Sequence, residues 1–425
     1  MHNILILAIL LFTILGMPIG YCLGAATLFA LLYAGSFPLI VIPQQIFAGI
    51  DSFPIMAIPF FILAGNLMTA GGINQKIIRF CNSLIGWVTG SLAMVTVVAS
   101  MFFAAISGSA VATVAAIGGI TIPAMKKEKY SGAFAAAVAS SSGVCGPIIP
   151  PSIPLIVYGA ALSMSVSDLF LGSVIPGIML GLSLCVASYV ISKRNNFPKH
   201  ERAPRAEVRR AAKEGFWALI MPLVILGSIF SGIVTPTEAS VIAVMYALIV
   251  GLFIYRDLKF KDLHHILCES AISTAVIMII LATSKASSWV VVTSRFPETL
   301  SSAILSFTNS KFIILILVNI ILLIVGCLME ANAAIVILTP ILVPLVAKVG
   351  VSPLHFGVLM TFNLCLGLLT PPVGAALLLG NDIAEEKIEK TLVATVPFFL
   401  VGLVSLALLT FIPEIITFLP ELLKK

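Results

Sequence analysis

The chain has 425 residues, of which 60% are hydrophobic and 10% charged, and its mean hydropathy is +1.16. A soluble domain carries roughly 25% charged residues, so this composition excludes a large soluble protein and, with it, soluble enzyme folds and nucleic-acid binders. The formal net charge of +6 reflects lysines and arginines in loops rather than an affinity for nucleic acid.

The charged residues are clustered, and long stretches between the clusters carry none. No Asp, Glu, Lys or Arg precedes Asp51, and none lies between Arg79 and Lys126. Because a helix that spans a bilayer needs about 20 apolar residues, such stretches predict an all-α polytopic membrane protein. The seven cysteines lie mostly inside these stretches without a CxxC motif, which predicts buried thiols rather than a disulfide framework or a zinc site.

Taken in chain order, the apolar segments predict about ten membrane crossings, with the same number in each half. The predicted crossings are residues 3–15, 18–34, 47–70, 131–165 and 170–192, then 216–233, 238–255, 266–293, 353–381 and 391–412. Two further apolar segments, about 88–125 and 312–347, are each too long for one crossing. Each is interrupted by a small or polar cluster, Ser107-Gly108-Ser109 or Glu330-Ala331-Asn332, which predicts the tip of a re-entrant hairpin.

An internal repeat relates the two halves of the chain. Adding 221 to a residue number places Pro123 on Pro344, Gly146 on Gly367, Pro150-Pro151 on Pro371-Pro372, Gly159 on Gly380 and Pro176 on Pro397. Glycine and proline fix backbone shape, so their coincidence in one register indicates a shared fold. Because each half has an odd number of crossings, the second repeat is predicted to be inverted relative to the first.

This repeat divides the chain into three parts. The first inverted repeat is predicted over 1–192, with its broken helix at 131–165, and the second over 216–425, with its broken helix at 353–381. Between them lies a basic linker at 193–215. Under this arrangement 18 lysines and arginines face the cytoplasm and five, including Lys424 and Lys425, face the other side, which agrees with the positive-inside rule. Both termini are then predicted to face the periplasm.

Each half combines a hairpin tip with a Pro-Pro interruption of the next crossing. Irregular backbone inside a bilayer is tolerated only where protein or a water-filled cavity satisfies its polar groups. Free N–H groups at such helix ends favour an anion and free carbonyl groups favour sodium, a pairing typical of secondary transporters. The alternative is that the prolines only kink helices for packing, which does not explain why both halves repeat the same order.

Several long strings resemble one family. They are AIPFFILAGNLM at 57–68, ISGSAVATVAAIGGITIPAM at 106–125, GPIIPPSIPLIVYG at 146–159, PTEA at 236–239 and LTPPVG at 369–374. In this order they resemble the large membrane subunit (DctM-like) of tripartite ATP-independent periplasmic (TRAP) transporters. The resemblance covers essentially the whole chain and implies an elevator-type importer of organic acids in the bacterial inner membrane, driven by sodium.

The resemblance also implies the partners. A periplasmic substrate-binding protein would deliver the small organic acid, and a small four-helix membrane subunit, expected as a separate chain, would complete the transporter. Beyond membrane lipid and these proteins no partner is implied, and nucleic acid is not expected. Sodium is the coupling ion, and no other cofactor is expected.

The ion sites implied by the family lie where the hairpin tips face the helix breaks. The first site would use oxygens of Ser107, Gly108, Ser109, Gly146, Pro147 and Pro150, and the second those of Glu330, Asn332, Asn363, Thr370 and Pro371. For the first tip the alternative is a close helix contact through small residues. The carboxylate of Glu330 could ligate sodium, bind a proton or cap the helix that begins beside it.

Lys285 lies inside the predicted crossing 266–293. Its side chain could snorkel to the membrane surface, pair with a substrate carboxylate or contact the small subunit. It is not assigned to a site, and the substrate-binding residues are left open.

The chain has no HExxH, GxSxG or P-loop motif, so the chemistry of a protease, a hydrolase or an ATP-driven pump is missing. A transporter subunit, rather than an enzyme, is therefore the main hypothesis. A stand-alone ion-coupled organic anion carrier and a membrane-embedded enzyme that acts on lipid-soluble substrates are the alternatives.

Overall fold

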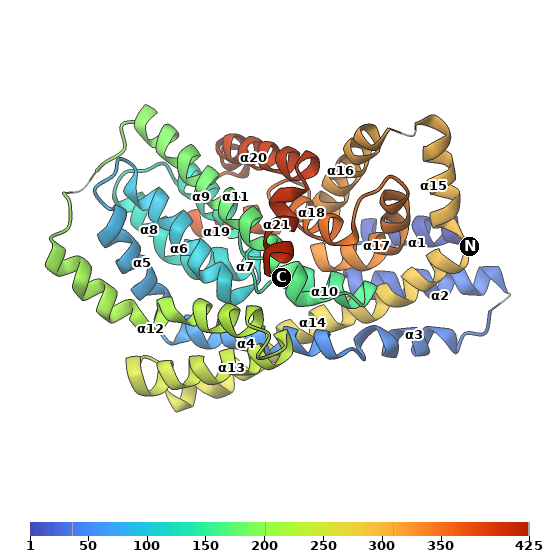
Figure 1. Cartoon of the computed structure of the whole chain (residues 1–425), viewed down its shortest axis with the longest axis horizontal. Helices are drawn as coiled ribbons and strands as arrows, with labels where there is room; N and C mark the ends of the chain where they lie inside the picture. Colours follow the sequence, from blue (N-terminus) through green and yellow to red (C-terminus); the bar gives the residue numbers. More distant parts are fainter. Residues whose placement is uncertain (36, 200, 309, 424–425) are drawn as a thin grey trace.

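The computed structural model describes residues 1–35, 37–199, 201–308 and 310–423, and in these ranges it contains helices and no strand (Figure 1). This confirms the predicted all-α class. The first half contains α1 (His2–Ile14), α2 (Ile19–Ala34), α3 (Val41–Ile50), η1 (Phe53–Met56), α4 (Ala57–Ala70), α5 (Ile73–Ile85), α6 (Ser91–Ser107), α7 (Ala110–Thr113), η2 (Val114–Gly118), α8 (Gly119–Lys127), α9 (Gly132–Gly143), α10 (Ile153–Leu162) and α11 (Val166–Arg194). The second half contains α12 (Arg205–Phe230), α13 (Pro236–Ile249), η3 (Val250–Tyr255), α14 (Phe260–Thr293), α15 (Phe296–Phe307), α16 (Lys311–Leu328), α17 (Ala331–Lys348), α18 (Pro353–Gly367), α19 (Ala375–Ala384), α20 (Ile388–Phe411) and α21 (Glu414–Leu423).

Eight helices within the described ranges are long and apolar enough to cross a membrane. They are η1 with α4, α11, α12, α13 with η3, α14, α16, α17 and α20. The remaining apolar helices are shorter because the chain is interrupted between them. Lys424 and Lys425, which the sequence predicts on the periplasmic side, lie outside the described residues.

One predicted crossing, residues 47–70, is not a single helix. Helix α3 ends at Ile50, and a new helical segment begins at Phe53. Ser52 adopts an extended backbone with φ −146°, and Pro54 follows without an N–H group to donate into a preceding turn. The helices α5 and α15 were not predicted from the sequence. Both are amphipathic, with polar residues on one face, and both lie outside the apolar runs.

The four predicted interruptions are present as breaks between helices. The first hairpin segment breaks at Gly108-Ser109, between α6 and α7, and the second at Met329-Glu330, between α16 and α17. The two Pro-Pro segments separate α9 from α10 and α18 from α19. Helix positions in the two halves therefore match after adding 221, although the inverted orientation of the halves and the re-entrant path of the hairpins stay predictions.

The broken helices of one half pack against elements of the other half. Helix α9 contacts α19 and α20, and α10 contacts α17 and α18. In Figure 1, α10 and α18 lie near the middle of the molecule, with α6, α8 and α9 toward one end and α16 and α17 toward the other. A continuous core of buried apolar side chains joins these elements. The first Pro-Pro break is thus enclosed by protein, whereas the second reaches the surface at Pro371.

The closest approach between the second hairpin and its broken helix is made by two glycines. A Cβ atom at Gly367, on α18, would lie 2.7 Å from the carbonyl oxygen of Gly326, on α16. A Cβ atom at Gly326 would lie 2.9 Å from the carbonyl oxygen of Leu364. Because both obstacles are backbone atoms inside packed helices, neither can move aside as a side chain does, and only glycine fits at these positions.

We therefore expect Gly367→Ala to destabilise the protein by about 1–3 kcal/mol, the usual cost of overpacking a core. The measurement is thermal unfolding of the detergent-solubilised chain. Gly227→Ala is the matched control, since a Cβ atom there meets nothing within 4 Å and alanine favours the helix. Equal unfolding temperatures for Gly367→Ala and the control would contradict the close contact.

Candidate functional site

The first hairpin tip packs directly against the first Pro-Pro break. Gly108 ends α6 with φ +61°, a conformation that favours glycine, and a Cβ atom there would lie 2.7 Å from the carbonyl oxygen of Pro151. A Cβ atom at Gly146 would contact the carbonyl oxygen of Ser109 and lie 2.8 Å from Oγ1 of Thr113. The predicted contact between this tip and this break is therefore formed by backbone on both sides.

The oxygens of this first cluster are partly paired with one another. Oγ of Ser107 lies 3.1 Å from Oγ1 of Thr113, and that hydroxyl donates to the carbonyl oxygen of Ser109 at 2.7 Å. The side chain of Ser109 caps α7 by accepting a hydrogen bond from the N–H of Ala112 at 3.4 Å. The sequence-based prediction did not include Thr113, although it carries the third hydroxyl in an otherwise apolar run, after those of Ser107 and Ser109.

Within the first break, the carbonyl oxygen of Pro147 accepts a hydrogen bond from the hydroxyl of Ser152. The same hydroxyl caps α10 by accepting from the N–H of Leu155. Pro150, which precedes a cis peptide bond, is buried in this break. Pro147 and Pro150 therefore belong to the enclosed turn that places α10, and the carbonyl of Pro147 already has a partner.

At the second tip, Glu330 caps α17. Its carboxylate accepts hydrogen bonds from the N–H of Asn332 at 2.9 Å and of Ala333 at 3.3 Å. A third donor, the side-chain amide of Asn332, lies 2.6 Å from the other carboxylate oxygen. Of the alternatives for Glu330, the geometry shows the cap: negative charge at a helix start is stabilised by the free N–H groups there. Proton or sodium binding by this carboxylate stays a prediction.

Asn363 on α18 is held by a chain of amide contacts. Its Nδ2 donates to the carbonyl oxygen of Asn319 at 3.1 Å and to Oδ1 of that residue at 2.8 Å. Nδ2 of Asn319 in turn donates to Oγ1 of Thr410 at 2.9 Å. Asn319 was missed by the sequence analysis, although it is the one amide in the apolar run of α16. These contacts use Nδ2 of Asn363 and leave its Oδ1 without a partner among the described residues.

The second break departs from the first. Thr370 donates to the carbonyl oxygen of Gly367 at 2.8 Å, and its hydroxyl lies 2.6 Å from Sγ of Cys327. The N–H of Val373 bonds to the carbonyl oxygen of Cys327 at 3.1 Å, which ties this break to the end of α16. Pro371, however, is exposed, whereas its counterpart Pro150 is buried. The structure therefore brings Thr370 to the hairpin but leaves Pro371 at the surface.

Several oxygens on the helices beside the breaks are buried and have no hydrogen-bond partner among the described residues. They are Oγ of Ser140 and Ser141 on α9, Oδ1 of Asn332 on α17, and Oγ1 of Thr361 and Oδ1 of Asn363 on α18. Buried polar atoms are normally satisfied by protein, water or an ion. All of these are neutral oxygen atoms, and the described chain has no group of three His, Cys, Asp or Glu side chains that could hold a transition metal. Neutral oxygens suit a hard monovalent cation.

Known proteins are similar to this chain over most of its length. Residues 6–415 match the family model of the "Tripartite ATP-independent periplasmic transporter, DctM component". The chain is similar to the isethionate TRAP transporter permease protein DctMQ of Oleidesulfovibrio alaskensis, with 42% identity over 95% of this chain and 64% of that protein's length. It is also similar to the sialic acid TRAP transporter large permease protein SiaM of Vibrio cholerae, with 36% identity over 96% of this chain and 95% of the relative.

Solved structures share the fold at low sequence identity. The YdaH transporter of Alcanivorax borkumensis superimposes with a TM-score of 0.62 at 12% identity, over 86% of this chain and 87% of that one. MtrF of Neisseria gonorrhoeae superimposes with a TM-score of 0.61 at 13% identity, over 90% of this chain and 85% of that one. At such identities the likeness concerns the fold alone.

The cap at Glu330 leads to a test of its structural role. We expect Glu330→Ala to destabilise the protein by about 0.5–2 kcal/mol, since the first turn of α17 loses its acceptor. Glu330→Gln keeps one oxygen and should unfold at a temperature nearer to that of the unchanged chain. The measurement is thermal unfolding, and Glu207→Ala, which alters an exposed first-turn carboxylate that makes no cap, is the control. Equal losses for the Ala and Gln variants would contradict the cap.

Proposed function

The chain belongs to the DctM component family of tripartite ATP-independent periplasmic transporters, and we propose that it imports an organic acid across the bacterial inner membrane, coupled to sodium entry. As a member of this family it is a TRAP large permease and not an enzyme. The observation that carries sodium coupling is the set of buried neutral oxygens on α9, α17 and α18 that have no partner among the described residues and lie near the helix breaks. Such oxygens lose hydrogen bonds to water and regain favourable contacts only with a cation or an ordered water.

The helix ends at these breaks support the same proposal. Helices α6, α9, α16 and α18 end at the breaks, and α7, α10, α17 and α19 begin there. Helix ends carry partial negative charge and helix starts partial positive charge. A cation beside the first group and an anion near the second would therefore both be stabilised, which is the pattern of ion-coupled anion transport.

The substrate class rests on the relatives. Similar large permeases are named for sialic acid, for 2,3-diketo-L-gulonate and for C4-dicarboxylates, and the permease DctMQ is named for isethionate. All four are organic anions. We therefore assign an organic acid, a carboxylate or a sugar acid, as the substrate.

Membership of the family also supports two partners. A small four-helix membrane subunit, as a separate chain, would complete the permease, and a periplasmic binding protein would deliver the acid. In our proposal transport follows an elevator mechanism in which the hairpins and broken helices of two inverted repeats move together. A stand-alone ion-coupled carrier would need no binding protein, and this difference separates the two hypotheses.

The drive can be measured directly. In proteoliposomes that contain the chain, its small subunit and the binding protein, we expect an inward sodium gradient to accumulate organic acid without ATP. Omitting the binding protein should abolish uptake, whereas undiminished uptake would favour the stand-alone carrier. Equal uptake from choline buffer with only a proton gradient would rule out sodium coupling.

The proposed orientation has a separate test. Among the seven cysteines, Cys268 is exposed and Cys327 is half-buried, and the other five are buried. Replacing these two therefore gives a starting chain with little labelling of its native cysteines. Single cysteines are then placed at the exposed positions Lys199 and Lys348. With both termini periplasmic, an impermeant maleimide should label position 348 in intact cells and position 199 only after permeabilisation. The opposite pattern would contradict the orientation and the inversion.

A further inference from the structure

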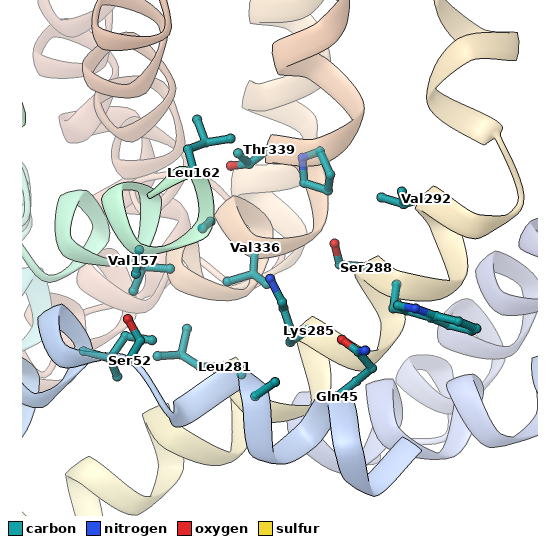
Figure 2. A pocket seen from close by; sticks show the side chains of 17 residues that line it. Gln45, Ser52, Val157, Leu162, Leu281, Lys285, Ser288, Val292, Val336 and Thr339 are labelled. Atoms are coloured by element: carbon teal, nitrogen blue, oxygen red, sulfur yellow. The ribbon is translucent and has the colours of Figure 1, made fainter. Parts of the chain in front are cut away.

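A cavity of about 320 Å³ lies between α3, α10, α14 and α17 (Figure 2). Its lining is mainly apolar, with Val157 on one wall and Leu281 on another. The polar side chains that line it come from three helices and the η1 entry: Gln45, Ser52, Lys285, Ser288 and Thr339. One cationic group and four neutral polar groups therefore face a space that would hold about ten water molecules at ~30 Å³ each.

The ammonium group of Lys285 makes no ion pair and no hydrogen bond to any described residue, and none of the described residues that line the cavity is acidic. Figure 2 shows its ammonium group directed into the cavity toward Val336, away from the surface of α14. A charged side chain inside a membrane-spanning helix is costly unless water or an opposite charge compensates it. Since no described lining residue supplies a counter-charge, the ammonium group is available to water or to an anion in the cavity.

Helix α3 packs closely against α14 beside Lys285. A Cβ atom at Gly49, on α3, would lie 2.9 Å from Cβ of Lys285 and 3.2 Å from the carbonyl oxygen of Ala282. Glycine at this position therefore lets the two helices that line the cavity approach each other at the base of the lysine side chain.

We propose that this cavity binds the anionic group of a small, hydroxylated organic monoanion, a carboxylate or a sulfonate, with Lys285 as its counter-charge. The proposal rests on the proposed function and deepens it by naming the substrate class. A single lysine balances a single anionic group, so a dianion would leave one charge uncompensated in an apolar lining. Gln45, Ser52, Ser288 and Thr339 offer donors and acceptors for hydroxyl groups. The volume lies near the lower end for ligand pockets, which favours a small molecule.

The position of the cavity links it to the helix breaks. Asn332, Val336 and Thr339 are spaced four and three residues apart on α17, so they share one face of that helix. With a rise of 1.5 Å per residue, the cavity begins roughly 6 Å from Asn332, whose Oδ1 is buried without a partner. The opposite wall includes Val157, five residues after the cap of α10 at Ser152. A bound anion would thus contact both helices that start at the proposed ion clusters.

The test is equilibrium binding to the full-length chain in lipid nanodiscs and sodium buffer. The probes are radiolabelled gluconate and 3-hydroxypropanesulfonate, which separate carboxylate from sulfonate, with unlabelled gluconamide and malate as neutral and dianionic competitors. We expect at least one monoanion to bind and gluconamide and malate to compete at least about tenfold more weakly. Lys285→Met should weaken binding at least about tenfold, as expected for losing a charged hydrogen bond, and Lys285→Arg should restore most of it.

Lys348→Met removes an exposed lysine outside the cavity and should bind as the unchanged chain does. Binding of no monoanion, equal affinity for gluconamide, stronger binding of malate, or unchanged affinity in Lys285→Met would each overturn the proposal. Loss of the small subunit from Lys285→Met with unchanged probe affinity would assign the lysine to a subunit contact and would also overturn it. Monoanion binding that depends on Lys285, without sodium-driven uptake, would reject the proposed function and leave the cavity site standing.

Discussion

Every backbone N–H and C=O group within the hydrocarbon core of a membrane needs a hydrogen-bond partner, and this chain interrupts its helices at both hairpin tips and both Pro-Pro segments. Each interruption is satisfied by a different local device. Ser109 and Glu330 cap the helices that follow the hairpin tips, the hydroxyl of Ser152 bonds the carbonyl of Pro147, and the N–H of Val373 reaches the carbonyl of Cys327. Three of these bonds lie within one tip or one break, and the bond from Val373 to Cys327 joins a break to a hairpin.

The two halves meet this requirement at equivalent positions with different chemistry. Ser109 and Glu330 are related by the 221-residue offset, and both cap a helix, one with a hydroxyl and the other with a carboxylate. Ser140 and Thr361 are likewise equivalent, and both present a buried hydroxyl oxygen without a partner among the described residues. A shared backbone plan with unlike side chains would give two sites of different ion affinity rather than two copies of one site.

The breaks could be predicted from the sequence because glycine and proline act locally. Gly108 and the Pro-Pro pairs impose their backbone shape whatever surrounds them, so their positions agree with the structure. The interruption at Ser52-Phe53 was missed, although Asp51, Ser52 and Pro54 break the apolar run at that point. Asn319 and the cavity were missed for a different reason: each is defined by residues distant in sequence that only the fold brings together.

Glu330 and Lys285 show why a lone charge in an apolar run cannot be interpreted from sequence. Both occur in predicted membrane segments, and both could be functional on that ground alone. In the structure, three donors within one turn bond to the carboxylate of Glu330, and this cap stabilises the start of α17. The ammonium of Lys285 has no partner within the described chain and faces a cavity. A charge with partners stabilises its own helix, whereas a charge that faces a cavity without a partner can interact with a ligand. The difference between them is geometric, and it points to the lysine rather than the acid as the group that recognises substrate.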